Sequence, residues 1–186
     1  MPELLRVIGC GNRARGDDAA GILVAERLRE LGVEAESLSG ETTALLEAWR
    51  GSDEVIVVDA VVSGAPCGTV HVWDSPQPLA LGGFPASTHG MGVLEAINLA
   101  RTLGCLPRRL RLYGIEARQF SFGGALSPEL LGAVEKVVQQ ILRQAHWCTG
   151  KASEPRASTH KQGGCPKIRD FVAAEVRRLN PARIRR

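Results

Sequence analysis

The chain has 186 residues, a length that suits one domain of ordinary size with an appendage. Its formal net charge of +3 is small and argues against a dedicated nucleic-acid-binding protein. No apolar run approaches the roughly 18 residues that a membrane helix needs. The N-terminus also lacks a basic region before an apolar stretch and a small-residue cleavage site, so we expect no signal peptide. We also expect no membrane partner.

The cysteines are odd in number and widely spaced, and none forms a Cys-x-x-Cys pair. They are Cys10, Cys67, Cys105, Cys148 and Cys165. This spacing argues against a disulfide framework and against a cysteine zinc site. We therefore expect a cytoplasmic protein with reduced thiols, and we expect it to be a monomer.

A glycine-rich loop, residues 9–18, follows an apolar run and leads into a helical pattern. The run, Leu4 to Gly9, predicts a buried strand, and the pattern after Asp18 predicts a helix. Glycines in such a loop allow backbone conformations that other residues reach only with strain. We expect Asp17 or Asp18 to cap the helix and to face its positive end.

The rest of the first 148 residues alternates strand and helix patterns. Strands are predicted at 33–38, 55–58, 69–73 and 110–115, and helices at 42–49, at 89–103 and from Ser127 and Pro128 onward. The β-branched run 55–58 predicts a strand buried on both faces that ends at Asp59. The short connection to 69–73 favours an antiparallel strand there. These patterns indicate an α/β domain with a mainly parallel sheet and helices on both faces.

Buried helix faces follow from apolar spacing. We expect Ile22, Ala25, Leu28 and Leu31 to be buried in the first helix, and Leu131, Val134, Val138, Ile141 and Leu142 in the last. From about Thr149 the composition changes to Gly, Ser, Lys and Pro without periodicity. We therefore divide the chain into a domain, 1–148, and a basic, disordered tail, 149–186.

Acid and imidazole groups follow the predicted strands, where doubly wound sheets bind their ligands. Asp17 and Asp18 follow the first strand, Asp59 ends the third, and His89 opens the long helix after the fourth. Two carboxylates and an imidazole can hold a divalent ion and leave positions open for water or substrate. Each residue alone also has a structural explanation: a helix cap, a strand-end turn or an exposed loop histidine.

Two other hypotheses fit parts of the loop. Gly9, Gly11 and Ala14 match a relaxed dinucleotide-binding fingerprint, with Glu34 or Glu36 as the ribose-binding acid. The two aspartates weaken this hypothesis, because a pyrophosphate would meet negative charge at the helix start. A nucleophilic Cys10 paired with His89 is disfavoured by the same carboxylates, so we expect Cys10 to be a small packed residue.

Five blocks in order resemble the nickel–iron hydrogenase maturation proteases. Residues 9–21 resemble the family's G-x-G-N…D-[DE]-x-x-G opening, and residues 57–70 its D-A-x-x-S-G…P-G-T-V block. Residues 87–93 resemble its S-x-H-x-L-G-L block. Residues 113–116 match its last strand, and residues 126–128 match the start of its last helix. One departure is Ser39-Gly40-Glu41-Thr42, where family members commonly have Asp-Gly-Gly-Thr; Glu41 can replace that aspartate.

The resemblance implies a three-layer α/β/α fold with a five-stranded sheet. It implies an endopeptidase that removes a C-terminal extension from a hydrogenase large-subunit precursor after nickel insertion. Asp18, Asp59 and His89 are then the metal ligands, the nickel is that of the substrate, and no organic cofactor is needed. We further hypothesise aspartic-type cleavage, in which Asp18, Asp59 or Asp17 polarises the attacking water. The alternative is a metal- or dinucleotide-binding α/β protein without peptidase activity.

Overall fold

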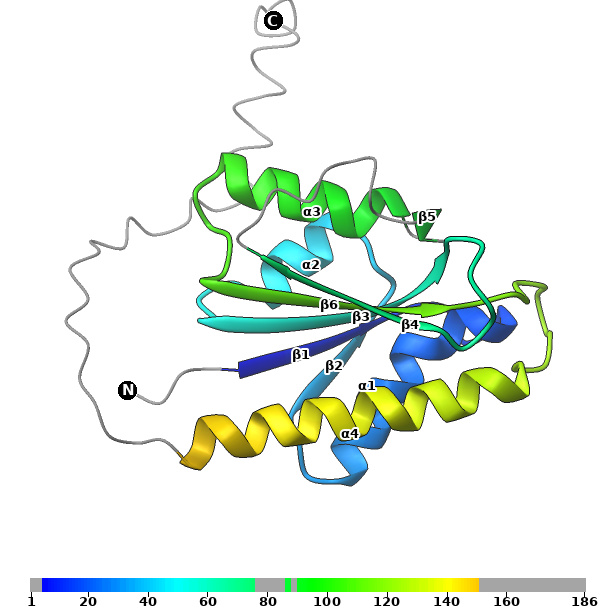
Figure 1. The fold of residues 1–186 in the computed structure, drawn as a ribbon. Helices are drawn as coiled ribbons and strands as arrows, with labels where there is room; N and C mark the ends of the chain where they lie inside the picture. The colour runs from blue at the N-terminus through cyan, green and yellow to red at the C-terminus, as the bar shows by residue number, and fades with distance from the viewer. Residues whose placement is uncertain (1–4, 76–85, 88–89, 151–186) are drawn as a thin grey trace, which may run out of the picture.

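The computed structural model describes residues 5–75, 86–87 and 90–150, and its central feature is a mixed sheet (Figure 1). The strand order is β2-β1-β3-β6-β4. These strands are β2 (Ala35–Leu38), β1 (Leu5–Cys10), β3 (Glu54–Val62), β6 (Arg109–Glu116) and β4 (Val70–Ser75). All neighbours run parallel except β4, which is antiparallel to β6. A two-residue strand, β5 (Ala86–Ser87), pairs with the end of β3.

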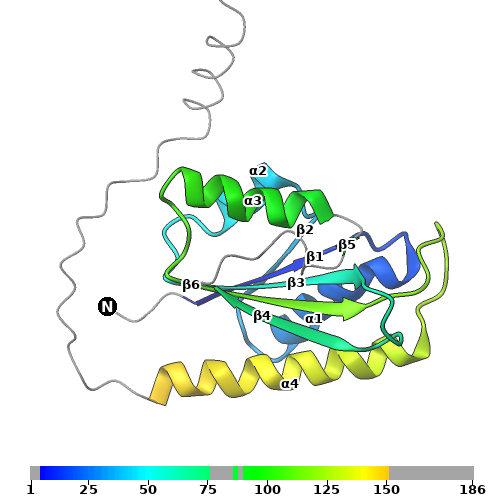
Figure 2. The same cartoon turned by 45° about the horizontal axis from the view of Figure 1, so that its top comes forward.

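Helices cover both faces of this sheet (Figures 1 and 2). One face carries α1 (Ala20–Glu30) and α4 (Pro128–Gly150), and the other carries α2 (Thr42–Ala48) and α3 (Gly90–Thr102). The predicted three-layer α/β/α fold with a mainly parallel sheet is therefore confirmed. The antiparallel strand predicted at 69–73 is also confirmed as β4, although its partner is β6 and not the strand that precedes it in the chain.

The buried strand β3 supplies both halves of the core. Ile56 and Val58 pack on the α1/α4 side, whereas Val55 and Val57 pack on the α2/α3 side. All four side chains are almost completely buried, as the continuous β-branched run predicts. The sequence predicts that this strand ends at Asp59, but it continues to Val62. Pairing of residues 59–61 with β6 extends it beyond the end of β1.

Two leucines predicted to lie in the core are exposed. Leu31 is 46% exposed because α1 has already ended, and Gly32, with a φ of 81°, turns the chain away. Leu131 is 50% exposed, and its neighbour Leu130 takes the buried position. The other predicted inward positions of these helices are buried or half-buried.

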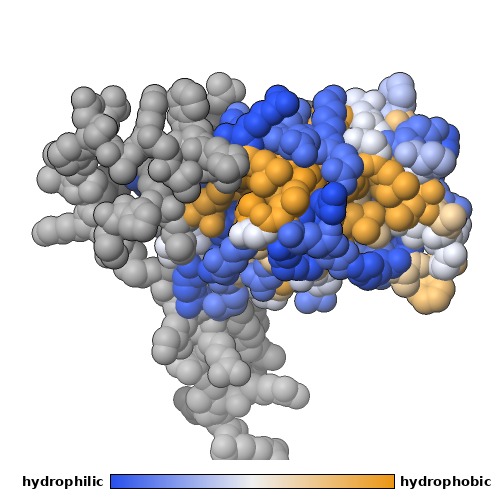
Figure 3. All heavy atoms as spheres, turned by 90° about the horizontal axis from the view of Figure 1, so that it is seen from below, coloured by the Kyte–Doolittle hydropathy of each residue, from blue (hydrophilic) through white to orange (hydrophobic). Residues whose placement is uncertain are grey.

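The outer surface of the α1/α4 layer is mostly polar, with apolar patches between the polar groups (Figure 3). No helix within the described ranges is both long enough and apolar enough to cross a membrane. The predicted tail, 149–186, lies outside the described residues except for the last two residues of α4.

Candidate functional site at the carboxyl edge of the sheet

A tight 3-10 turn, η1 (Gly16–Ala19), follows β1 and carries the two adjacent aspartates. Asp17 and Asp18 are both fully buried, and the turn contacts β3 as well as α1. The expectation that one of them caps the first helix is wrong. Helix α1 begins at Ala20, its N-cap position is Ala19, and no side chain caps it. The two carboxylates are therefore available for other contacts.

Close packing explains Gly9 at the start of the first loop and Gly21 in α1. A Cβ atom on Gly9 would lie 2.0 Å from the carbonyl oxygen of Gly21, and one on Gly21 would lie 2.3 Å from that of Val58. Helix α1 thus rests directly on the backbones of β1 and β3, which a side chain at either position would prevent. This packing brings η1 to the carboxyl edge of the sheet and needs no bound phosphate to explain the glycines.

Asp17 joins this turn to the loop between β6 and α4. Its carboxylate accepts hydrogen bonds from the backbone N–H groups of Arg118 (3.0 Å), Gln119 (2.9 Å) and Ser127 (2.7 Å) and from the Ser127 hydroxyl (2.7 Å). Burial raises the pKa of Asp17, but these hydrogen bonds outweigh it and hold the pKa below its ordinary value. Asp17 is thus an ionised carboxylate engaged in a structural contact. Ser127 precedes α4 as predicted, but its hydroxyl donates to Asp17.

Asp59 lies on β3, one residue beyond the last pair between β3 and β1. It is 5% exposed, and its Oδ1 accepts a hydrogen bond from the N–H of Ala60 at 2.9 Å. The strand alternation puts its side chain on the same face as Val57 and Cys10. Burial and then the nearby Asp59 carboxylate raise the pKa of the Cys10 thiol well above its usual value. Cys10 is therefore a packed thiol and not a nucleophile, as expected.

His89 lies outside the described residues, but the described chain approaches it from both sides. Ser87 of β5 pairs with Val61 of β3, two residues past Asp59, and α3 begins at Gly90. Within the described ranges, no group of three His, Cys, Asp or Glu side chains could hold a metal ion. Asp18, Asp59 and His89 as a ligand set therefore stay a prediction.

Glu41 marks the departure from the family pattern, and its segment packs beside the start of α3. A Cβ atom on Gly92 would lie 2.0 Å from the carbonyl oxygen of Gly40. The Thr42 hydroxyl donates to the carbonyl oxygen of Gly92 at 3.2 Å. Glu41 itself is exposed. The segment thus lies against the first turn of the helix that follows His89.

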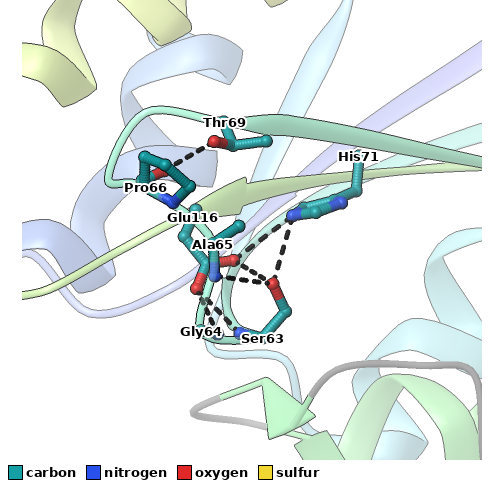
Figure 4. A network of polar contacts seen from close by, with 7 residues as sticks. All are labelled: Ser63, Gly64, Ala65, Pro66, Thr69, His71 and Glu116. Atoms are coloured by element: carbon teal, nitrogen blue, oxygen red, sulfur yellow. Dashed lines mark hydrogen bonds and ion pairs between the residues drawn. The ribbon is translucent and has the colours of Figure 1, made fainter.

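Glu116 is a buried acid that the strand patterns did not single out. It ends β6, is 2% exposed and accepts hydrogen bonds from the N–H groups of Ser63 (2.8 Å) and Gly64 (3.0 Å) and from the Ser63 hydroxyl (2.7 Å) (Figure 4). His71 lies 3.3 Å from the same carboxylate. Burial raises the pKa of Glu116, but the hydrogen bonds from Ser63, Gly64 and His71 outweigh it and lower the pKa. A charged residue at the end of a buried apolar strand is the signal that could have identified it.

The two acids of the dinucleotide hypothesis line a hollow that the glycine loop does not border. Glu34 and Glu36 line a hollow of about 460 Å³ beside β2, together with Arg6 and Arg29. Arg6 forms an ion pair with Glu36 at 3.5 Å. None of the residues that line this hollow belongs to the glycine loop.

The three layers, with buried acids where the parallel strands β1 and β3 meet the carboxyl edge of the sheet, define an α/β/α protein. A model of the hydrogenase maturation protease family matches residues 37–144. The hydrogenase expression/formation protein HupD of Thiocapsa roseopersicina is 32% identical over 148 residues, which are 76% of this chain and 66% of HupD. The hydrogenase 2 maturation protease of Escherichia coli is 29% identical over 161 residues, 83% of this chain and 97% of that protein.

Solved structures agree with this similarity. The hydrogenase maturating endopeptidase HybD from E. coli has a TM-score of 0.66 at 27% identity, over 77% of this chain and 93% of HybD. The [NiFe] hydrogenase maturation protease HybD from Thermococcus kodakarensis also has a TM-score of 0.66, over 76% of this chain and 99% of that protein. Its identity is 22%, so this similarity supports the fold alone. The chain belongs to the hydrogenase maturation protease family.

Proposed function

We propose that this chain is an endopeptidase that removes the C-terminal extension of a nickel–iron hydrogenase large-subunit precursor after nickel insertion. The observation that carries the proposal is the burial of Asp18, in the turn after β1, and of Asp59, on the neighbouring parallel strand β3, in a member of a maturation protease family. Buried acids at the carboxyl edge of a parallel sheet, where folds of this kind bind their ligands, favour a chemical role for the pair.

In this proposal Asp18, Asp59 and His89 contact the nickel that the precursor already carries. Carboxylate and imidazole groups are suitable ligands for nickel, and three protein ligands leave positions for those of the substrate. The enzyme would thus recognise a precursor into which nickel has already been inserted. A precursor without nickel would bind weakly, because the buried acids would then meet no positive charge.

Cleavage in this proposal uses a water molecule that Asp18 or Asp59 orients toward the scissile carbonyl and from which it accepts a proton. Backbone N–H groups of the surrounding loops can donate to the oxyanion that forms. The hydrogen bonds of Asp17 support a positioning role: it holds η1, and with it Asp18, against the loop before α4. The partner is the precursor, which the protease meets as a monomer in the cytoplasm.

The test incubates the purified chain with a precursor prepared with and without nickel and measures the precursor's mass. Loss of one C-terminal peptide from the nickel-loaded form alone is the expected result. Nickel binding without any cleavage would favour the alternative, a metal-binding protein without peptidase activity. Tight binding of NAD in a calorimeter, again without cleavage, would favour a dinucleotide-binding protein.

A further inference from the structure

Asp59 and His71 lie in one row across three strands, with Gly114 between them. Gly114 of β6 is the register partner of Asp59 on β3 and of His71 on β4. Register partners in neighbouring strands point to the same face of a sheet. The side chains of Asp59 and His71 therefore project from the α2/α3 face of the sheet at the same level along the strands. Gly114, which has no side chain, lies between them.

An apolar surface fills the space over Gly114. A Cβ atom there would lie 2.8 Å from Cζ3 of Trp73 and 2.8 Å from Cγ1 of Val61. The ring of His71 is stacked on that of Trp73, with centroids 5.5 Å apart and an interplanar angle of 21°. A peptide that reached from Asp59 to His71 would thus cross the edge of an aromatic ring, which can pack against an apolar side chain.

The contacts of His71 determine which of its ring nitrogens carries the proton. Nε2 lies 3.4 Å from the Ser63 hydroxyl and 3.3 Å from Oε2 of Glu116 (Figure 4). The Ser63 hydroxyl donates its own proton to Glu116, and the ionised carboxylate can only accept. Both groups therefore require a proton on Nε2. In the neutral ring, Nδ1 then carries a lone pair and is a hydrogen-bond acceptor.

This acceptor is available to a ligand. The imidazole is 26% exposed, and Nδ1 has no hydrogen-bond partner among the residues that the structure describes. Glu116, Ser63 and Trp73 hold the ring from three sides, so little rotational freedom is left for a ligand to restrict. A fixed acceptor beside an apolar ring matches an N–H group flanked by an apolar side chain, which is what an extended peptide presents.

We propose that His71 is a substrate-binding residue, whose Nδ1 accepts a hydrogen bond from a peptide N–H of the precursor segment lying across Trp73. This inference rests on the proposed function, because it takes a peptide as the substrate of the Asp59 site. Glu116 is then a positioning residue that fixes the tautomer of His71, and it does not contact the substrate.

Two variants separate substrate binding from a purely structural role. His71→Asn puts an amide oxygen near the position of Nδ1 but loses the contact with Glu116, whereas His71→Gln restores an N–H toward Glu116 but has no acceptor at Nδ1. The dissociation constant is measured with a nickel-loaded precursor whose scissile bond cannot be hydrolysed, which prevents turnover while Asp59 stays in place, and thermal unfolding is recorded for each variant. A parallel cleavage assay with His71 variants of otherwise wild-type sequence gives KM and kcat.

We expect His71→Gln to weaken binding about five- to tenfold, the size of one lost hydrogen bond, and to raise KM with kcat unchanged. His71→Asn should retain most of the affinity even where its unfolding midpoint is lower. The reverse order, in which His71→Gln binds the precursor as tightly as the chain with His71 and His71→Asn binds it weakly, would overturn the proposal. So would the absence of precursor binding by the chain with His71. Cleavage of the ordinary precursor by the unsubstituted chain reports separately on the proposed function, because binding of the uncleavable precursor does not depend on turnover.

Discussion

Asp17 and Ser127 lie 110 residues apart in the chain and are joined by two hydrogen bonds of 2.7 Å, from the N–H and the hydroxyl of Ser127 to the Asp17 carboxylate. Both residues are buried. The contact ties the first loop of the chain to the start of the last helix. The turn that carries Asp18 is thus held in place by Asp17, the residue before it.

Replacing Asp17 with Asn should lower the free energy of unfolding by about 2–3 kcal/mol at pH 7, since hydrogen bonds to a charged acceptor are lost. The native pKa of Asp17 is lowered, so its contribution is fully present above the ordinary Asp pKa of about 4. It is lost as the pH falls through the native value. Denaturant unfolding of both chains between pH 7 and pH 2 should show the difference shrinking below about pH 4.

Asp74→Asn is the matched control for this prediction. Asp74 forms an ion pair with Arg111 at the surface, and its side chain is 57% exposed. Exposed pairs of this kind contribute about 1 kcal/mol or less. Two results would contradict the role given to Asp17. One is a loss of unfolding free energy in Asp74→Asn as large as that in Asp17→Asn. The other is a loss in Asp17→Asn that does not change with pH.

Gly21→Ala should destabilise the protein by more than about 2 kcal/mol, because its Cβ would lie 2.3 Å from the carbonyl oxygens of Cys10 and Val58. The control is Gly132→Ala on the exposed face of α4, where a Cβ would meet nothing within 4 Å. That change should stabilise the helix by up to about 1 kcal/mol. Equal effects of the two substitutions in thermal unfolding would show that α1 does not rest on the sheet as described.

Cys10 should resist thiol reagents in the native state, since it is fully buried and its pKa is raised. The measurement uses two chains that each keep one cysteine, Cys10 or the half-buried Cys67, with the other four changed to Ser. Cys67 should react with a disulfide reagent before unfolding, and Cys10 only after it. Rapid modification of Cys10 in the folded chain would reopen the nucleophile hypothesis.

Much of the architecture followed from apolar periodicity. The run 55–58 predicted a strand buried on both faces, and the alternation of strands with helices predicted the layers. The strand lengths were harder to predict, because β3 continues past Asp59 through pairing with residues of β6 and β5 that lie much further along the chain. Leu31 and Leu131 were misplaced for a local reason: the helix end and the neighbouring Leu130 decide their exposure.

The site was predictable in part. Asp17, Asp18 and Asp59 could be placed at one edge of the sheet, because parallel strands end together. The structural role of Asp17 could not be predicted, because its hydrogen-bond partners are more than 100 residues away in sequence. The contact between Glu116 and His71 likewise depends on the antiparallel register of β4 on β6, which no local pattern determines.

The central claim is that Asp18 and Asp59 carry out the cleavage. The most direct test is the mass of a nickel-loaded precursor after incubation with the wild-type chain and with the Asp18→Asn/Asp59→Asn chain. A double variant of the exposed helix residues Glu47 and Glu135, each changed to Gln, is the control for lost negative charge. We predict that the wild-type and control chains release the C-terminal peptide, and that the double Asn variant, folded by circular dichroism, releases none. Release at the wild-type rate by the double Asn variant would contradict the claim.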